Sequence, residues 1–307
     1  MRKAFNKVLL DIAAKRDNVF MILADIGYGE IEPFAENFPD RFINCGVAEQ
    51  NMTGVACGVA MEGNTAITYS IANFPTLRCL EQIRNDVCYH NADVKIVIIG
   101  GGLAYGPLGI SHHSTEDLAI MRALPNMVCL APCDIPEAIA ATKAMMEYKG
   151  PVYFRCGYKG ELDIHEKPIE NFQFGKAIEV LPGKDVTLFF TGTIGYNAKL
   201  AALEAAKMNI SVRLVSMPCI KPIDKDAIIN AAKETGAILT VEEHQLSGGF
   251  GSAVAEVLAE ANIPCRFKRM GLNDVNVSKI GSQDWLRDEY NLGVKDIVDS
   301  IVELSKK

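Results

Sequence analysis

The sequence shows no excess of positive charge and no long uninterrupted apolar run. Its 38 acidic residues outnumber its 31 basic ones, which gives a net charge of -7 and no broad electrostatic footprint for nucleic acid. The longest uncharged run, residues 96–112, is broken by five glycines and a proline, and such a run does not span a bilayer. We therefore expect the protein to bind neither nucleic acid nor a membrane.

The nine cysteines also lack a pattern. They are scattered, with no CxxC pair and no Cys/His grouping at the spacing of a zinc site, so the sequence predicts no disulfide framework and no metal ligand in this chain. The first residues, MRKAFNKVLLDIAAK, have no continuous apolar core of the kind that a signal peptide needs, and they predict an amphipathic helix instead. Together these observations favour a cytoplasmic protein.

What the sequence does contain is an alternation of short apolar runs with helix-like stretches. At 307 residues with 49% hydrophobic content, the chain is long enough for two cores. The alternation predicts an α/β fold of two domains with mainly parallel sheets. A polar stretch containing glycine and proline separates the two series, which gives a first domain at 1–160, a linker at 161–184 and a second domain at 185–307.

The individual elements are predicted from the same patterns. The expected strands are 19–23, 66–69, 94–99, 127–130 and 152–154, then 186–190, 211–215 and 237–241. The expected helices are 77–90 and 135–148, then 197–208, 225–235, 252–261 and 294–304.

The stretch NCGVAEQNMTGVACGVAMEG, residues 44–63, places one carboxylate, Glu49, before a run of small and apolar residues. Apolar residues recur after it at helical spacing, so a helix should begin near Glu49. From the residues alone, two interpretations stay open. Either Glu49 caps its own helix, where the dipole favours negative charge, or it is a partly buried carboxylate that shares a proton with a ring nitrogen.

The segment GVAEQNM resembles the one that contacts the cofactor in transketolases, and in the related deoxyxylulose-phosphate synthases and oxo-acid dehydrogenase β subunits. Further segments resemble transketolases in the expected order, and the resemblance covers nearly the whole chain. These segments are ILADIG (22–27), ITYSIANFPTLRCLEQIRNDVCYHN (67–91), GISHHSTEDLAIMRALPNMVCLAPCD (109–134), GPVYFRCG (150–157) and VEEHQLSGGFGSAV (241–254). The resemblance implies a pyrimidine-binding domain at 1–160 and a transketolase C-terminal domain at 185–307.

The resemblance also implies thiamine diphosphate as cofactor, in a transketolase that transfers a two-carbon ketol unit from a ketose or ketose phosphate to an aldose. Glu49 would hydrogen-bond to N1′ of the pyrimidine and activate the cofactor as a catalytic residue. Phe74 stands where the family has an aromatic ring that stacks on the pyrimidine, although a Phe after a strand is often simple core. Ile71 occupies a neighbouring position, and Asp25 matches an acidic position near the cofactor.

Four further residues match substrate-side positions of the family. His112 would hydrogen-bond or exchange protons with the reacting oxygens, which makes it the second catalytic candidate, and His113 beside it also occurs in the synthase relatives. Arg155 aligns with the arginine that grips a sugar phosphate, and Arg2 aligns with a second such arginine. For His112 and Arg2, a surface histidine and a solvated terminus are the ordinary alternatives.

Three positions depart from the family pattern. Leu108 stands where transketolases usually carry an Asp, the run from Gly100 stands where they carry a phosphate-binding His, and Gly29 replaces a Ser. The substrate is therefore expected to differ from an ordinary sugar phosphate. A shorter, branched or differently charged molecule fits equally well, and the sequence determines neither the donor nor the acceptor.

The sequence also lacks the GDG segment with which the family holds the diphosphate through Mg²⁺. The resemblance therefore implies the C-terminal subunit of a split transketolase, whose N-terminal partner subunit carries the diphosphate and Mg²⁺ site. Since active sites in the family form between two protomers, we expect an α2β2 heterotetramer and weak cofactor binding by this chain alone.

Other functions stay open beside this one. The β subunit of a 2-oxo-acid dehydrogenase and a deoxyxylulose-phosphate synthase-like subunit share the same kind of glutamate. A non-catalytic pairing subunit would keep the fold without the chemistry. The joint presence of Glu49, Phe74, His112 and Arg155 argues against that last alternative. The motif GGFGSAV lacks the lysine of a P-loop, so it predicts tight packing or a regulatory role rather than a phosphate site.

Overall fold

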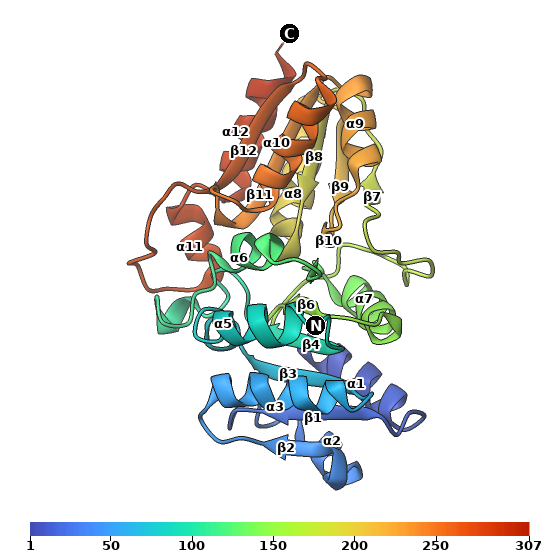
Figure 1. The fold of residues 1–307 in the computed structure, drawn as a ribbon. Coiled ribbons are helices and arrows are strands. Elements are labelled where there is room, and N and C mark those ends of the chain that lie inside the picture. Colours follow the sequence, from blue (N-terminus) through green and yellow to red (C-terminus); the bar gives the residue numbers. More distant parts are fainter. Residues whose placement is uncertain (307) are drawn as a thin grey trace.

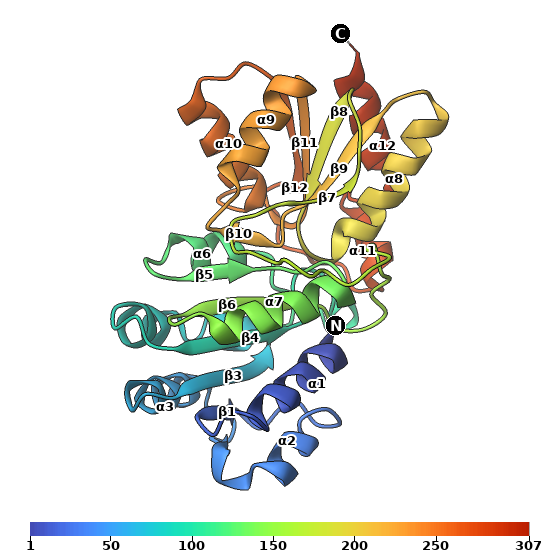
Figure 2. The same ribbon diagram turned by 90° about the vertical axis from the view of Figure 1, so that its right-hand side faces the viewer.

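Two sheets organise residues 1–306, which are the part of the chain that the computed structural model describes (Figures 1 and 2). The strands of the first sheet are β1 (Val19–Leu23), β2 (Phe42–Asn44), β3 (Thr65–Ile71), β4 (Val94–Ile99), β5 (Val128–Leu130), β6 (Val152–Cys156) and β10 (Cys219–Lys221). The strands of the second sheet are β7 (Ile178–Leu181), β8 (Val186–Phe190), β9 (Val212–Ser216), β11 (Ala237–Gln245) and β12 (Arg266–Leu272).

Both sheets are mainly parallel. The first has the strand order β10-β5-β6-β4-β3-β1-β2, and only the pair of β10 with β5 is antiparallel. The second has the order β12-β11-β8-β9-β7, and only the pair of β7 with β9 is antiparallel. The predicted α/β fold with two mainly parallel sheets is therefore confirmed.

Helices alternate with the strands along the chain in both halves. They are α1 (Arg2–Ala13), α2 (Glu32–Asn37), α3 (Glu49–Met61), α4 (Asn73–Thr76), α5 (Leu80–Gln82), the π-helical turn η2 (Ile83–Cys88), α6 (Asp117–Ala123) and α7 (Ile135–Glu147). The helices of the second half are α8 (Gly195–Lys207), α9 (Lys225–Glu234), α10 (Phe250–Ala261), α11 (Gln283–Glu289) and α12 (Val294–Ser305). Single 3₁₀ turns lie at η1 (Pro39–Arg41), η3 (Gly106–Leu108) and η4 (Gly192–Ile194).

Helices cover both faces of each sheet, as Figure 2 shows. On the first sheet, α1 and α7 pack on one face, and α3, η2 and α6 pack on the other. Strand β4 explains this arrangement, because Ile96 and Ile98 join the core under α3 while Val97 and Ile99 join the core under α1. Strands that are apolar on both faces require such a double cover.

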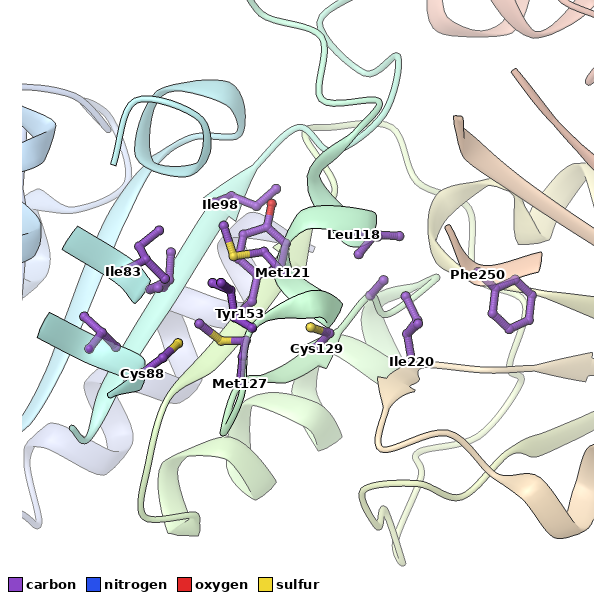
Figure 3. Packing of buried hydrophobic residues seen from close by; sticks show 14 of the residues in the cluster. Ile83, Cys88, Ile98, Leu118, Met121, Met127, Cys129, Tyr153, Ile220 and Phe250 are labelled. Atoms are coloured by element: carbon purple, nitrogen blue, oxygen red, sulfur yellow. The ribbon is translucent and has the colours of Figure 1, made fainter. Parts of the chain in front are cut away.

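One hydrophobic cluster continues from the first sheet into the second half of the chain. Figure 3 shows Leu118 of α6 and Ile220 of β10 between the first-sheet residue Tyr153 and Phe250 of α10. All four side chains are at most 2% exposed. The two halves therefore share a core, and burial of that apolar surface stabilises their contact.

The boundary between the halves differs from the expectation in two ways. Strand β7 lies inside the predicted linker 161–184 and pairs with β9 of the second sheet. Strand β10 comes from the second half of the chain but pairs with β5 of the first sheet. Both strands are short and antiparallel, and neither carries the apolar run that a buried parallel strand shows. The domain limits 1–160 and 185–307 stay a prediction.

Most other elements agree with the predicted ones to within a few residues. The expected helix 77–90 is instead split into α5 and the π-helical turn η2. Strands β2 and β12 and helices α2, α6 and α11 were not predicted. β2 has three residues, and β12 carries three basic side chains among its seven residues, so neither has a clear strand signal. None of the helices in residues 1–306 combines the length and the apolar character that crossing a membrane needs.

A buried ion pair joins the first sheet to α6 and to the second half. Nε and Nη2 of Arg155, at the end of β6, donate to the carboxylate of Asp117 at 2.8 and 3.2 Å. The Arg155 side chain is 5% exposed and that of Asp117 is 1% exposed. Nη2 also donates to the carbonyl oxygens of Ser114 and Glu243, and the Tyr153 hydroxyl donates to Asp117. This geometry satisfies both charges in a site without water access.

Replacing Arg155 by methionine should therefore destabilise the fold strongly. The variant keeps the carboxylate of Asp117 buried and removes its charged partner, which costs about 3–5 kcal/mol of unfolding free energy. Urea denaturation measures this loss. Lys225→Met is the matched control, because Lys225 and Glu260 form an exposed ion pair, and its loss should cost less than about 1 kcal/mol. Similar losses in the two variants would contradict the buried pair.

Candidate active site

The carboxyl ends of the first sheet's parallel strands meet at one edge, and most of the predicted site residues follow these ends. Asp25 follows β1, Glu49 follows β2, Ile71 ends β3, and Phe74 lies in α4 directly after β3. His112 lies in the loop after β4. Ligands of open parallel sheets bind at this edge, outside the carboxyl ends of the strands. The edge is therefore the candidate active site.

Glu49 is the first residue of α3 and is 3% exposed. Helix α3 has no side-chain cap hydrogen bond, so Glu49 does not cap its helix in that way, although its place in the first turn suits the helix dipole. Its Oε2 instead accepts a hydrogen bond from Nη1 of Arg78 at 2.6 Å. No residue within 1–306 donates a hydrogen bond to Oε1. The buried carboxylate thus has one oxygen held by an arginine and one oxygen open to another donor.

A row of contacts connects Glu49 to Phe74 and His112. The guanidinium carbon of Arg78 lies 5.2 Å from the centroid of the Phe74 ring. The Phe74 and His112 rings meet edge to face with their centroids 5.2 Å apart. Nδ1 of His112 is 2.9 Å from the hydroxyl of Ser111, which holds the imidazole in place. The structure therefore brings Glu49, Phe74 and His112 to one place, through Arg78.

The row continues beyond His112 through two tyrosines. The Tyr105 ring centroid lies 5.9 Å from that of His112 and 4.3 Å from that of Tyr158. The guanidinium of Arg2 stands 5.7 Å from the Tyr158 ring centroid, and its Nη2 donates to Glu30 at 2.9 Å. Arg2 is thus at the far end of the same row, with its charge already paired.

Asp25 and Ile71 lie at the near end of this edge. Asp25 is exposed and has a left-handed backbone with φ of +53°. Its carboxylate accepts hydrogen bonds from Tyr28 and Asn44, which hold the pKa of Asp25 below its ordinary value. Ile71, the last residue of β3, is half-buried. Asp25 therefore braces the loops after β1 and β2, and Ile71 leaves part of its side chain open at the edge.

Arg155 does not join this group. All of its hydrogen bonds go to Asp117 and to the two buried carbonyl oxygens of Ser114 and Glu243. A phosphate would have to displace Asp117 from a site that water does not reach. The prediction that Arg155 grips a sugar phosphate is therefore not supported, because its surroundings make it a structural link between the two halves.

His113 is also separate from its neighbour His112. It is 2% exposed, and neither of its ring nitrogens has a hydrogen-bond partner among residues 1–306. Burial lowers the pKa of the His113 imidazole from its ordinary value, so the neutral form is favoured. The imidazole of His113 is thus enclosed in the protein, whereas that of His112 is partly exposed at the edge.

The three positions that depart from the family pattern have different surroundings. Side chains at Gly100 and Gly102 would collide with the Tyr105 ring and with Glu243, at 2.2 and 2.6 Å, so this run is needed for close packing. Gly29 lies in an open turn and donates its N–H to Glu32. Leu108 is 53% exposed and lines a cavity of 840 Å³ between the two halves. Only Leu108 is placed to contact a small molecule.

The 840 Å³ cavity borders the candidate site without containing it. Its lining includes Tyr105, Leu108 and Tyr158 from the first half and Tyr196 and Arg287 from the second. None of Glu49, Phe74 and His112 lines it. Tyr105 faces both regions, since its ring approaches His112 on one side and Tyr158 on the other. A substrate bound at His112 would extend along Tyr105 toward this cavity.

The residues present fit one end of thiamine diphosphate. The half-exposed Phe74 ring and the open Oε1 of Glu49 suit a flat heterocycle with a basic nitrogen. Among residues 1–306, the one group of three metal-ligating side chains that come together does not include a residue of this edge.

Sequence reasoning missed Arg78, Tyr105 and Tyr158. Arg78 lies within a segment that resembles the family, but its ion pair with Glu49 links residues 29 positions apart. The signal that was present is the single basic residue in the turn between α4 and α5, at the edge where Glu49 also lies. Tyr105 and Tyr158 follow β4 and β6 at the same edge, which is the only sequence signal they give.

Comparisons with known proteins show the family of the chain. Residues 1–159 match the family model "Transketolase, pyrimidine binding domain", and residues 175–297 match "Transketolase, C-terminal domain". The chain is 36% identical over 307 residues to an apulose-4-phosphate transketolase subunit of Phocaeicola vulgatus, a match that covers 100% of this chain and 97% of that protein. It is 40% identical over 310 residues to a putative transketolase C-terminal section of Methanocaldococcus jannaschii, with 100% and 96% covered.

A solved structure gives the same result at the level of the fold. It is described as a split gene transketolase in the form of an inactive beta4 tetramer. The TM-score is 0.89 at 36% sequence identity, and the match covers 99% of this chain and 97% of that one. The two-sheet arrangement is therefore that of a known family.

The state of His113 makes stability depend on pH. Because burial lowers its pKa, the unfolded chain takes up a proton near pH 6.5 that the folded chain takes up only at lower pH. Stability is therefore full above this value and falls as the pH drops through it. In His113→Gln, the loss of unfolding free energy between about pH 7 and about pH 5 should be smaller than in the native chain, by at most about 2 kcal/mol, the limit that the unfolded histidine sets. Urea denaturation at the two pH values measures it, and an equal loss in both chains would refute the neutral state.

Proposed function

This chain belongs to the transketolase family, and we propose that it is the subunit of a split, thiamine diphosphate-dependent transketolase that binds the pyrimidine end of the cofactor. The reaction is the transfer of a two-carbon ketol unit from a ketose to an aldose. The observation that carries the proposal is the buried carboxylate of Glu49. Arg78 binds one of its oxygens and also contacts the Phe74 ring, which in turn contacts His112. The other carboxylate oxygen is free to bind a ligand.

Glu49 holds a proton at N1′ of the pyrimidine in this proposal. The cofactor supplies the electron sink for cleavage of a carbon–carbon bond beside a carbonyl. The contribution of the protein is the position and protonation of one ring nitrogen. A carboxylate with 3% exposure keeps water from competing for that proton.

Arg78 is a positioning residue in this account. Its 2.6 Å ion pair fixes Oε2 of Glu49, so that Oε1 faces the ligand. The Arg78 side chain is itself 50% exposed, and its guanidinium lies over the Phe74 ring. One arginine thus orients both the carboxylate and the aromatic ring of the pyrimidine site.

The remaining residues divide between cofactor and substrate. Phe74 and Ile71 line the pyrimidine, and Asp25 fixes the loops around it. His112, held by Ser111, faces the reacting oxygens of the sugar. Tyr105 and Tyr158 then give the sugar chain an aromatic wall that ends at Arg2. In this proposal His113 and Arg155 stabilise the fold and do not contact the substrate.

A phosphorylated ketose is the substrate class that we favour. The relative from P. vulgatus is named for apulose-4-phosphate, and it matches this chain from end to end. Arg2 is the cation at the end of the row, and release from Glu30 would free it for an anionic group. The exposed Leu108 provides an apolar wall where a carboxylate would repel that anion.

A partner subunit is required for the complete site. The diphosphate and Mg²⁺ would be held by an N-terminal transketolase subunit, in an α2β2 assembly. The solved relative, described as inactive when its β chains form a tetramer, supports this dependence. All nine cysteines are free thiols, which supports a reducing compartment such as the cytoplasm.

Glu49→Gln tests the catalytic proposal. The amide keeps the shape of the side chain but does not take up the proton, so turnover should fall by at least about 100-fold. The assay uses the chain reconstituted with a transketolase N-terminal subunit, a ketose phosphate and an aldose. Glu62→Gln is the matched control, because Glu62 is exposed at the other end of the same helix.

The outcomes of that assay are distinct. Loss of turnover in Glu49→Gln alone, with an unchanged circular dichroism spectrum, supports the proposal. Normal turnover in Glu49→Gln sinks it. Turnover that depends on pyruvate would identify the synthase-like activity instead, and turnover of a 2-oxo acid with an electron acceptor would identify the dehydrogenase-type subunit.

Calorimetry tests the dependence on a partner. Because this chain holds only the pyrimidine end, the isolated chain should bind thiamine and thiamine diphosphate with similar, weak affinity. The assembled enzyme should bind thiamine diphosphate at least about tenfold more tightly than the isolated chain does. A clear preference of the isolated chain for the diphosphate form would contradict the split site.

A further inference from the structure

Three side chains outside the candidate active site point their ligand atoms at a common position. Cys133 lies between β5 and α7, Glu137 lies in the first turn of α7, and His165 lies in the segment that connects the two sheets. The thiol sulfur, one carboxylate oxygen and one ring nitrogen of these residues all lie within 4.8 Å of one another. None of the three takes part in the row from Glu49 to Arg2.

Two of these ligand atoms lack any partner. Glu137 is 0% exposed, and its Oε1 makes no hydrogen bond among residues 1–306. Nε2 of His165 is likewise buried without a partner, at 3.8 Å from that oxygen. The other oxygen of Glu137 accepts from the backbone N–H of Cys133 at 2.8 Å, so the carboxylate is anchored with Oε1 aimed at the histidine. Buried polar atoms of this kind are rare and costly unless something binds them.

Asp134 orients the histidine. Its Oδ2 lies 2.9 Å from Nδ1 of His165, and because a carboxylate accepts, Nδ1 carries a hydrogen and Nε2 is the ring nitrogen that faces Glu137. Asp134 also accepts from the backbone N–H groups of Ile164, His165 and Glu137, so it is held from both sides. A histidine that binds a metal has a carboxylate on its second nitrogen in this way.

We propose that Cys133, Glu137 and His165 bind a single Zn²⁺ or a similar transition-metal ion. A mixed set of sulfur, nitrogen and oxygen donors selects such an ion over Mg²⁺ or Ca²⁺, which prefer oxygen alone. Zinc–ligand distances of about 2.0–2.3 Å place tetrahedral ligand atoms roughly 3.3–3.8 Å apart, close to the observed spacing. The fourth position falls to water or to the Ser216 hydroxyl, which lies 3.9 Å from the sulfur of Cys133.

The position of this cluster suggests a structural role. His165 belongs to the connecting segment, Cys133 and Glu137 belong to the first half, and Ser216 ends β9 of the second sheet. A metal ion here would fix the connecting segment against both halves. The side chain of His165 is 11% exposed, so an ion reaches the cluster from that side.

Metal content measures the proposal directly. The full chain is stripped with a chelator, incubated with Zn²⁺ and freed of excess metal, and bound zinc is determined by mass spectrometry. We expect one zinc per chain, and a raised midpoint of thermal unfolding with zinc present. Loading with Co²⁺ should give the near-ultraviolet charge-transfer absorption of a thiolate ligand.

Two variants and two controls assign the ligands. His165→Gln and Cys133→Ser should each weaken zinc binding by at least about tenfold, and Cys133→Ser should abolish the thiolate absorption. His165→Gln is the primary variant, because the histidine lies in a connecting segment and is less buried than the other two. His90→Gln changes an exposed histidine, and Cys156→Ser changes a buried cysteine outside the cluster, so both should keep the zinc.

Other results would overturn the proposal. One is a chain that binds no zinc, in which case Glu137 and His165 close their 3.8 Å gap as a direct ion pair. Another is zinc binding that both ligand variants leave unchanged, which would place the metal on other residues. Because the readouts are metal content and absorption, they do not depend on whether the transketolase activity is found.

Discussion

The parallel pairing of six strands is the constraint on which the candidate site depends. Parallel neighbours bring all their carboxyl ends to one edge, so segments that lie far apart in the sequence open onto the same surface. The buried carboxylate of Glu49, the Phe74 ring and the His112 imidazole reach that edge from three different strand ends. A helix or turn alone would not gather them. The small residues of α3 then allow the helix behind Glu49 to pack closely on β1 and β3.

Much of the fold was predictable, because apolar runs and helical periodicity follow directly from burial on two faces. The short antiparallel strands β7 and β10 carry no such run, and they escaped prediction. The site was predictable to the extent that residues match family positions in order. Contacts were not: the ion pair of Glu49 with Arg78 and that of Arg155 with Asp117 join residues 29 and 38 positions apart. The cluster of Cys133, Glu137 and His165 could not be predicted for the same reason, since His165 comes from a separate segment of the chain.

A buried network of charged groups crosses the boundary between the two halves. Arg155 lies against Asp117 and against the carbonyl of Glu243, whose carboxylate in turn accepts from Arg287 and Gln283. These groups form one network from β6 through β11 to α11. Gly101 and Gly102 leave room for this network, because side chains there would overlap Arg155 and Glu243. The shared apolar core thus holds the two halves together, and the polar network fixes how they fit against each other.

Strand β10 has a consequence for how the molecule can be divided. In sequence it belongs to the second half, yet in space it covers the outer edge of β5. A first half produced alone would expose that edge as a row of unpaired backbone groups, which is a template for association with other strands. The two halves are thus not interchangeable modules, and a gene fusion or recombination event at the linker would have to carry β10 along with the sheet it completes.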